Sequence, residues 1–135
     1  MQNIDIIEIR SDYLNPNEWT PQLLVKIKNH AKKPLLLAIR HFSEDTPQNP
    51  RLETKKKLVE SALNLKYDFL DIDYSDIMNL TKIYTKSNQT TKLLISYHGN
   101  HIPNEKNIEK LIESMQKWNP AILKIVLACQ SALEA

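Results

Sequence analysis

The chain has 135 residues, of which 41% are hydrophobic and 25% charged, as is typical of one soluble globular domain. Its formal net charge of +2 leaves no strong excess of either sign, so neither nucleic acid nor an anionic membrane is expected as a partner. No apolar run approaches the roughly 20 residues of a membrane span, and the N-terminus lacks the residue order of a signal peptide. A single cysteine excludes an internal disulfide framework, and together these features predict a cytoplasmic protein.

The scarcity or spacing of some residue types excludes several kinds of site. The chain contains one glycine, so a glycine-rich phosphate-binding loop is not possible. Cysteine and histidine do not cluster at metal-ligand spacing, so no metal is expected. The three lysines at 55–57 fall in a helical pattern beside Glu53 and Glu60, which favours a solvated helix face over a phosphate-binding patch.

Apolar segments that alternate with helical patterns organise the chain. The segments expected to form strands are Ile4–Asp12, Pro34–Arg40, Tyr67–Tyr74, Thr91–His98 and Asn119–Ala128. The first of them alternates with a period of two, which places Glu8, Arg10 and Asp12 on one face. Charges on an apolar strand are costly unless they pair and face a polar cavity, so this face is expected to belong to a site.

The helices expected between these strands carry apolar stripes at helical spacing. Thr20 is expected to cap the first helix, with Pro21 in its first turn, and Asn104 to cap the fourth. The stripes are Leu23, Leu24, Ile27 and Ala31; Leu52, Leu58, Val59, Ala62, Leu63 and Leu65; Ile77, Leu80, Ile83 and Tyr84; and Ile108, Leu111, Ile112 and Met115. A fifth helix is expected to start at Ser131.

The fold class follows from this alternation. Strands and helices that recur about every 30 residues predict right-handed crossovers and a parallel sheet. Both a (β/α)8 barrel and a doubly wound open sheet have this pattern. Polar residues lie toward the carboxyl ends of the strands, as in barrel enzymes, and a glycine-rich first turn is absent. A full barrel needs about 250 residues, so the sequence predicts an α/β fold in which residues 1–135 form a single, incomplete TIM-type barrel domain.

The last apolar segment carries a lysine, Lys124, in its middle. The segment is typical of a strand buried on both faces. Burial disfavours the charged form of a lysine, and a neutral amine in an apolar site is the usual nucleophile for Schiff-base chemistry on a carbonyl. The alternative is a lysine whose head reaches solvent or pairs with a carboxylate.

Polar residues at two other strand ends share a face, Asp71 with Asp73 and Ser96 with His98. A histidine titrates near neutral pH and therefore suits acid and base catalysis. His101 is a competing candidate for that role, and a turn histidine bonded to the backbone is the alternative for His98. Asp71 and Asp73 are expected to pair with the arginines rather than to hold a cation.

Five segments, taken in order, resemble the type I 3-dehydroquinate dehydratases (type I dehydroquinases) of the shikimate pathway. They are Glu8-Ile-Arg-Ser-Asp12, Leu37-Ala-Ile-Arg40 followed by Glu44, Asp68-Phe-Leu-Asp-Ile-Asp73, Ile95-Ser-Tyr-His98 and Leu123-Lys-Ile-Val-Leu-Ala-Cys-Gln-Ser131. They resemble the family's Glu-x-Arg-x-Asp strand, its arginine strand with a loop glutamate, its Asp-x-x-Asp-x-Glu strand, its Ser-x-His strand end and the strand of its Schiff-base lysine. Five such segments in order, at barrel spacing, are specific.

The resemblance implies an enzyme, a carbon–oxygen lyase that dehydrates 3-dehydroquinate to 3-dehydroshikimate without a metal or cofactor. It makes Lys124 the Schiff-base lysine, His98 the general acid and base, and Glu44 the residue that orients His98; the alternative for Glu44 is simple solvation in a loop. The substrate-binding residues that it implies are Glu8, Arg10 and Arg40.

The chain also departs from the family pattern. The family's glycine pair after the loop glutamate is Asp45-Thr46 here, and its Asp-Phe after the histidine is Gly99-Asn100. The segments correspond to the second to sixth strands of the barrel, without the late-barrel arginine, serine and glutamine. An open sheet leaves two unpaired edges, so a homodimer, association with a missing piece or the recruitment of further strands is expected. The alternative functions are a non-catalytic partial barrel for assembly or partner binding, and another Schiff-base lyase or aldolase.

Overall fold

The computed structural model describes residues 4–11, 13, 18–40, 52–86, 90–100 and 104–128, and their strands form one parallel sheet. The strands are β1 (Ile7–Arg10), β2 (Leu35–Ile39), β3 (Phe69–Asp73), β4 (Lys92–Gly99) and β5 (Ile122–Leu127), in the order β1-β2-β3-β4-β5. The helices are α1 (Pro21–His30), α2 (Leu52–Asn64), the 3-10 helix η1 (Tyr74–Asp76), α3 (Ile77–Lys86) and α4 (Glu105–Gln116). This succession of parallel βα units confirms the predicted α/β fold of an incomplete TIM-type barrel.

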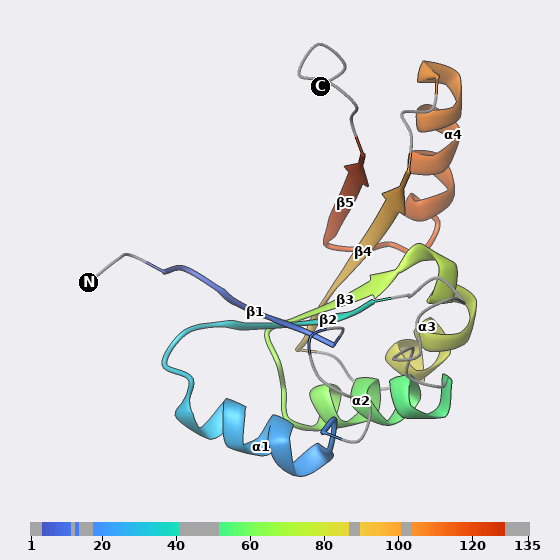
Figure 1. The fold of residues 1–135 in the computed structure, drawn as a ribbon. Coiled ribbons are helices and arrows are strands. Elements are labelled where there is room, and N and C mark those ends of the chain that lie inside the picture. Colours follow the sequence, from blue (N-terminus) through green and yellow to red (C-terminus); the bar gives the residue numbers. More distant parts are fainter. Residues whose placement is uncertain are drawn as a thin grey trace.

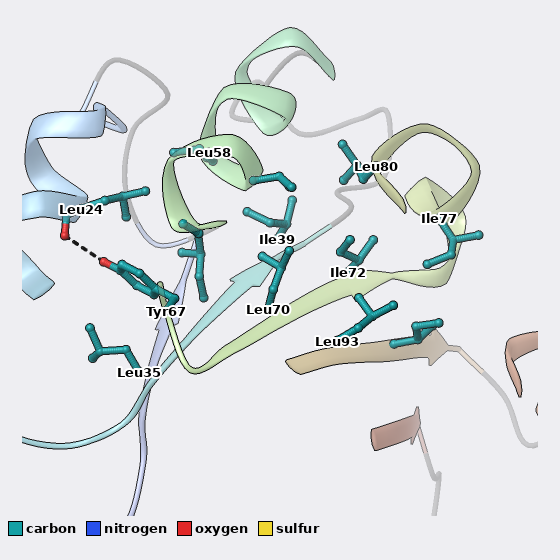
Figure 2. Close-up of a cluster of buried hydrophobic side chains, with 14 of the residues drawn as sticks. Leu24, Leu35, Ile39, Leu58, Tyr67, Leu70, Ile72, Ile77, Leu80 and Leu93 are labelled. Carbon is teal, nitrogen blue, oxygen red and sulfur yellow. Dashed lines mark hydrogen bonds between the residues drawn. The ribbon is translucent and has the colours of Figure 1, made fainter. Parts of the chain in front are cut away.

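The sheet has one covered face and one open face. Figure 1 shows the helices along one side of the curved sheet, with β1 and β5 at its two edges. Alternate strand residues pack beneath the helices, where the core lies. The buried strand residues of that core are Leu35, Leu37, Ile39, Leu70, Ile72, Leu93 and Ile95. Tyr67 closes one end of the core, because its buried hydroxyl donates to the Leu24 carbonyl at 2.9 Å (Figure 2).

Two of the helices begin where the sequence indicates. The Thr20 side chain accepts from the Leu23 backbone N–H at 3.2 Å, and Pro21 opens α1. The Asn104 side chain accepts from the Asn107 backbone N–H at 3.0 Å ahead of α4. Each cap satisfies a donor that has no partner inside its own helix, and so both predicted caps are confirmed. None of the described helices is both long enough and apolar enough to span a bilayer.

The strand register gathers polar residues on the open face. Asp73 lies opposite Ser96, and Ser96 lies opposite Lys124 on the next strand. His98 follows Ser96 by two residues and therefore shares its face. Parallel strands end at the same edge of the sheet, so these side chains meet near the carboxyl ends of β3, β4 and β5.

The expectation that the strand around Lys124 is buried on both faces is wrong. β5 is an edge strand of the described sheet, in which Ile122 is 41% and Val126 is 40% exposed. Leu123 packs against the core on the covered side. The apolar run therefore reflects one covered face and one open face, which composition alone does not distinguish from a fully buried strand.

The expectation of a solvated lysine face at 55–57 is wrong for its first residue. Lys55 is buried in α2, and its ammonium donates to the Asp76 carboxylate of η1 at 2.6 Å. Lys57 is exposed, as expected. A buried ion pair is stable only when its two charged groups are in close contact, because both have lost their hydration. The ion pair holds α2 against η1, the 3-10 helix that leads from β3 into α3.

The strand boundaries differ by a few residues from those expected. β1 begins at Ile7, and Ile4 and Ile6 are exposed ahead of it. β4 extends through Gly99, which pairs with Leu127 of β5. A Cβ at Gly99 would lie 2.9 Å from the Tyr97 ring, so the ring would have to shift to admit a side chain there. The helix expected from Ser131 lies outside the described residues.

Truncating a side chain in the central core should lower the free energy of unfolding more than truncating one at the surface. Leu70 is 0% exposed, so Leu70→Ala should lower the free energy of unfolding by about 2–5 kcal/mol through the cavity it leaves. Met78 of α3 is 61% exposed, so Met78→Ala should change it by about 0.5 kcal/mol or less. Urea denaturation followed by circular dichroism measures both variants. Equal losses would contradict the assigned core.

Candidate active site

The guanidinium of Arg40 is the centre of the polar cluster on the open face. Arg40 follows β2 directly, and its side chain is 8% exposed. One terminal nitrogen, Nη2, donates to Glu8 Oε1 of β1 at 3.1 Å. The other, Nη1, donates to Ser96 Oγ of β4 at 3.2 Å and lies 3.6 Å from Asp71 Oδ2 of β3. A single cation therefore connects side chains from three other strands.

The backbone of Arg40 is fixed by a residue that the sequence analysis did not identify. Its N–H donates to Ser11 Oγ at 3.0 Å, and the Ser11 N–H donates to the Ala38 carbonyl, also at 3.0 Å. The Trp19 indole N–H donates to the Ser11 carbonyl at 2.6 Å. Ser11 and Trp19 are both buried, and together they hold the ends of β1 and β2 in register. A serine among strand charges and a loop tryptophan are weak signals, and no sequence pattern connects them.

His98 contacts side chains through both of its ring nitrogens. Its Nδ1 lies 3.0 Å from Asp73 Oδ2, and its Nε2 lies 2.7 Å from Arg40 Nη1. These contacts differ from those of a turn histidine bonded to the backbone. The expectation that both aspartates pair with arginines is right for Asp71, but Asp73 contacts His98 instead. This contact depends on the register of β3 and β4, which the sequence does not specify.

Lys124 lies on the same face, one strand beyond His98. Its side chain is 35% exposed, and Nζ lies 3.9 Å from Glu8 Oε1. That oxygen also accepts from Arg40, so one carboxylate serves both cations. The contact agrees with the alternative expectation that Lys124 pairs with a carboxylate. In register, Lys124 lies opposite Ser96, which precedes His98 by two residues on β4.

The remaining predicted site residues are placed differently. Arg10 shares the face of β1 with Glu8, and its guanidinium carbon lies 4.6 Å from the centre of the Tyr13 ring. Glu44 and the competing His101 lie outside the described residues. The structure thus brings together four of the predicted residues: Glu8, Arg40, His98 and Lys124. Within the described ranges, no group of three or more acidic, histidine or cysteine side chains could hold a metal ion.

Asp71 is the buried acid of the cluster. It is 1% exposed beneath Arg40. Burial raises the pKa of Asp71, and the Ser96 hydroxyl and the charges of Arg40, Lys124 and His98 oppose that rise without cancelling it. The carboxylate therefore takes its proton more readily in the folded chain than in the unfolded chain.

Asp71→Asn should alter the pH dependence of stability. A raised pKa in the folded state stabilises the protein fully below the ordinary value of 3.8, and this stabilisation is lost as the pH rises through the folded pKa. Asparagine does not titrate, so the unfolding free energy of the variant should increase relative to the wild type across that window. Arg40 keeps Glu8 and Ser96 as partners. Urea titrations between about pH 3 and pH 8 measure the difference, and a constant difference would contradict the shift.

Comparison with known proteins agrees with the fold and shows the family. Residues 1–134 match the type I 3-dehydroquinase family. A 3-dehydroquinate dehydratase of Coxiella burnetii (strain CbuK_Q154) is 30% identical over 122 residues, which are 90% of this chain and 50% of that protein. One from Methanococcus maripaludis (strain S2 / LL) is 28% identical over 115 residues, 84% of this chain and 50% of that protein.

A solved structure shows the same fold at lower identity. The dehydroquinate dehydratase and shikimate dehydrogenase from S. pombe AroM matches with a TM-score of 0.75 and 20% identity, over 96% of this chain and 27% of that chain. The present chain spans about half the length of the curated relatives it matches. From the match over nearly all of its residues, the chain belongs to the type I 3-dehydroquinase family.

Proposed function

We propose that this chain carries the catalytic face of a 3-dehydroquinate dehydratase, with Lys124 as the Schiff-base lysine and His98 as the general acid and base. The observation that supports the proposal is the placement of both residues on one open face of adjacent strands. They stand near the carboxyl ends of those strands, where barrel enzymes hold their substrates. Membership of the type I 3-dehydroquinase family gives the reaction class.

The chemistry needs only side chains of the types present. The Lys124 amine adds to the ring ketone of the substrate and, with loss of water, forms an iminium. His98 removes a proton from the adjacent carbon, and the electron pair moves into the iminium to give an enamine. The enamine expels the hydroxyl group, which leaves as water with the proton held by His98. Hydrolysis of the iminium then releases 3-dehydroshikimate and restores the amine.

The substrate is a hydroxylated ring that carries a carboxylate and a ketone, and the cationic side chains of this face suit it. The planar guanidinium of Arg40 offers paired donors for a carboxylate or for hydroxyl groups. Arg10 and Glu8 extend the polar face along β1. From the family pattern we assign Glu44 to the orientation of His98. The reaction draws on no metal or cofactor.

The open sheet favours association. β1 and β5 each leave one edge of the described sheet unpaired, and such edges are templates for pairing with another chain. Exposed apolar side chains accompany these edges: Ile4, Ile6, Ile122 and Val126. We therefore propose that the chain forms a homodimer. Its single cysteine suits a reducing compartment, so we propose that it works in the cytoplasm.

Borohydride trapping tests the Schiff base directly. After incubation with 3-dehydroquinate and borohydride, the intact mass of the wild type should increase by one reduced adduct, and peptide mapping should place it on Lys124. Lys124→Ala should remove the adduct. Lys92→Ala is the matched control, since Lys92 is an exposed lysine at the amino-terminal end of β4, away from the proposed site. This variant should retain the adduct.

The trapping experiment has one outcome that overturns the proposal. Folded wild-type protein without any adduct would exclude Schiff-base catalysis on dehydroquinate by this chain. The family fold would then serve as a non-catalytic partial barrel. An adduct with small aldehydes or keto acids but not with dehydroquinate would instead support another Schiff-base lyase or aldolase.

Light scattering coupled to size-exclusion chromatography tests the association. The expected mass is twice that of the chain. Val126→Lys places a charge on the exposed apolar face of the edge strand and should shift the population toward the monomer. Met78→Lys, on the exposed surface of α3, is the control and should leave the dimer intact. A wild type that is monomeric at all concentrations would contradict the proposed homodimer.

A further inference from the structure

The two oxygens of the Asp73 carboxylate have different partners. Oδ1 accepts from the Ser75 backbone N–H at 3.0 Å and from the Ser75 hydroxyl at 2.6 Å. Oδ2 lies 3.0 Å from His98 Nδ1. The Asp73 side chain is 10% exposed, so water has little access to replace these partners. The carboxylate is therefore fixed in one orientation by the first turn after β3.

The contacts of His98 are satisfied by one tautomer. The Asp73 carboxylate only accepts, so His98 Nδ1, which lies 3.0 Å from Asp73 Oδ2, must carry a proton. A neutral imidazole with its proton on Nδ1 has an unprotonated Nε2. Arg40 Nη1 lies 2.7 Å from Nε2 and 3.4 Å from Nδ1, so it does not approach along the Nε2 lone pair and does not by itself select a tautomer. The opposite tautomer would set an acceptor against an acceptor at Asp73.

We propose that Asp73, anchored by Ser75, positions His98 at Nδ1, in addition to the Glu44 assigned from the family pattern: it holds the proton on Nδ1 and presents Nε2 as the nitrogen that exchanges protons with substrate. In the free protein, Arg40 Nη1 lies 2.7 Å from Nε2. The role in turnover rests on the proposed function. The tautomer does not, because it follows from the contact of Asp73 with Nδ1 alone.

Asp73→Asn separates positioning from the structural role of Asp73. The asparagine carbonyl can still accept from Ser75, so the turn after β3 keeps its cap. Its amide group then faces His98 Nδ1 as a donor, and Nδ1 must accept. The variant should therefore invert the tautomer of His98 to Nε2–H. Asp71→Asn is the matched control, because it makes the same chemical change two residues earlier on the same face of β3 and should leave the tautomer unchanged.

Nitrogen-15 NMR of the histidine rings in the full chain reads the tautomer without any assay of activity. His98→Gln assigns the His98 signals by their loss. At about pH 8.5, above the range in which imidazole normally titrates, the wild type should show protonated Nδ1 and unprotonated Nε2. A dominant Nε2–H form in the wild type, or an unchanged tautomer in Asp73→Asn, would overturn the proposal. The wild-type spectrum alone decides this if the variant does not fold.

Kinetics then connects the tautomer to turnover. On the proposed function, Asp73→Asn should lower kcat by about 100-fold or more, with a much smaller change in KM, because proton transfer by a positioned group contributes on that scale. Borohydride trapping on Lys124 should persist in the variant. A wild type with the expected tautomer but no adduct would count against the proposed function and leave the positioning inference standing. An unchanged kcat in Asp73→Asn alongside an inverted tautomer would overturn the catalytic part of the inference.

Discussion

The buried guanidinium of Arg40 is the interaction on which the arrangement of the open face depends. A cation that has lost its water must be matched by acceptors at close range, or it costs several kcal/mol. Glu8, Ser96 and Asp71 supply those acceptors from three different strands. Each would have to move if the register of its strand slipped by one residue, since a slip turns every side chain to the other face. One side chain therefore fixes four strands relative to one another.

This constraint also fixes the two side chains that are proposed to react. Glu8 accepts from Arg40 and lies beside the Lys124 amine, while Arg40 also contacts His98. The lysine and the histidine are thus linked through one carboxylate and one guanidinium. On the proposed function, a substrate carboxylate would exchange one set of ionic contacts of Arg40 for another.

The covered face stabilises the sheet. The polar face can therefore form although the described strands do not close into a barrel. Leucine and isoleucine side chains of β2, β3 and β4 pack beneath the helices at almost zero exposure, and they provide the hydrophobic stabilisation of the sheet. The edge strands β1 and β5 contribute less to this core. Exposed apolar side chains are found at these two edges of the sheet. Because the centre of the sheet is well packed and its edges are unpaired, association is proposed at the edges. The candidate site, in contrast, draws side chains from all the strands of the sheet.

The sequence by itself determined the order of elements, the parallel α/β class and the faces of the polar residues, because hydrophobic period and cap chemistry are local properties of the chain. The resemblance of its segments to the family pattern, rather than their strand positions alone, pointed to Glu8, Arg40, His98 and Lys124 as candidate site residues. Contacts between residues far apart in sequence were not determined by the sequence: the partner of His98 is Asp73, the anchor of Arg40 is Ser11, and Lys55 is buried by its pairing with Asp76. The exposure of β5 was equally inaccessible, since an apolar run has the same composition whether one face or both are covered. Only the tertiary structure decided these features, because register and helix placement set which side chains meet, and no local pattern encodes either.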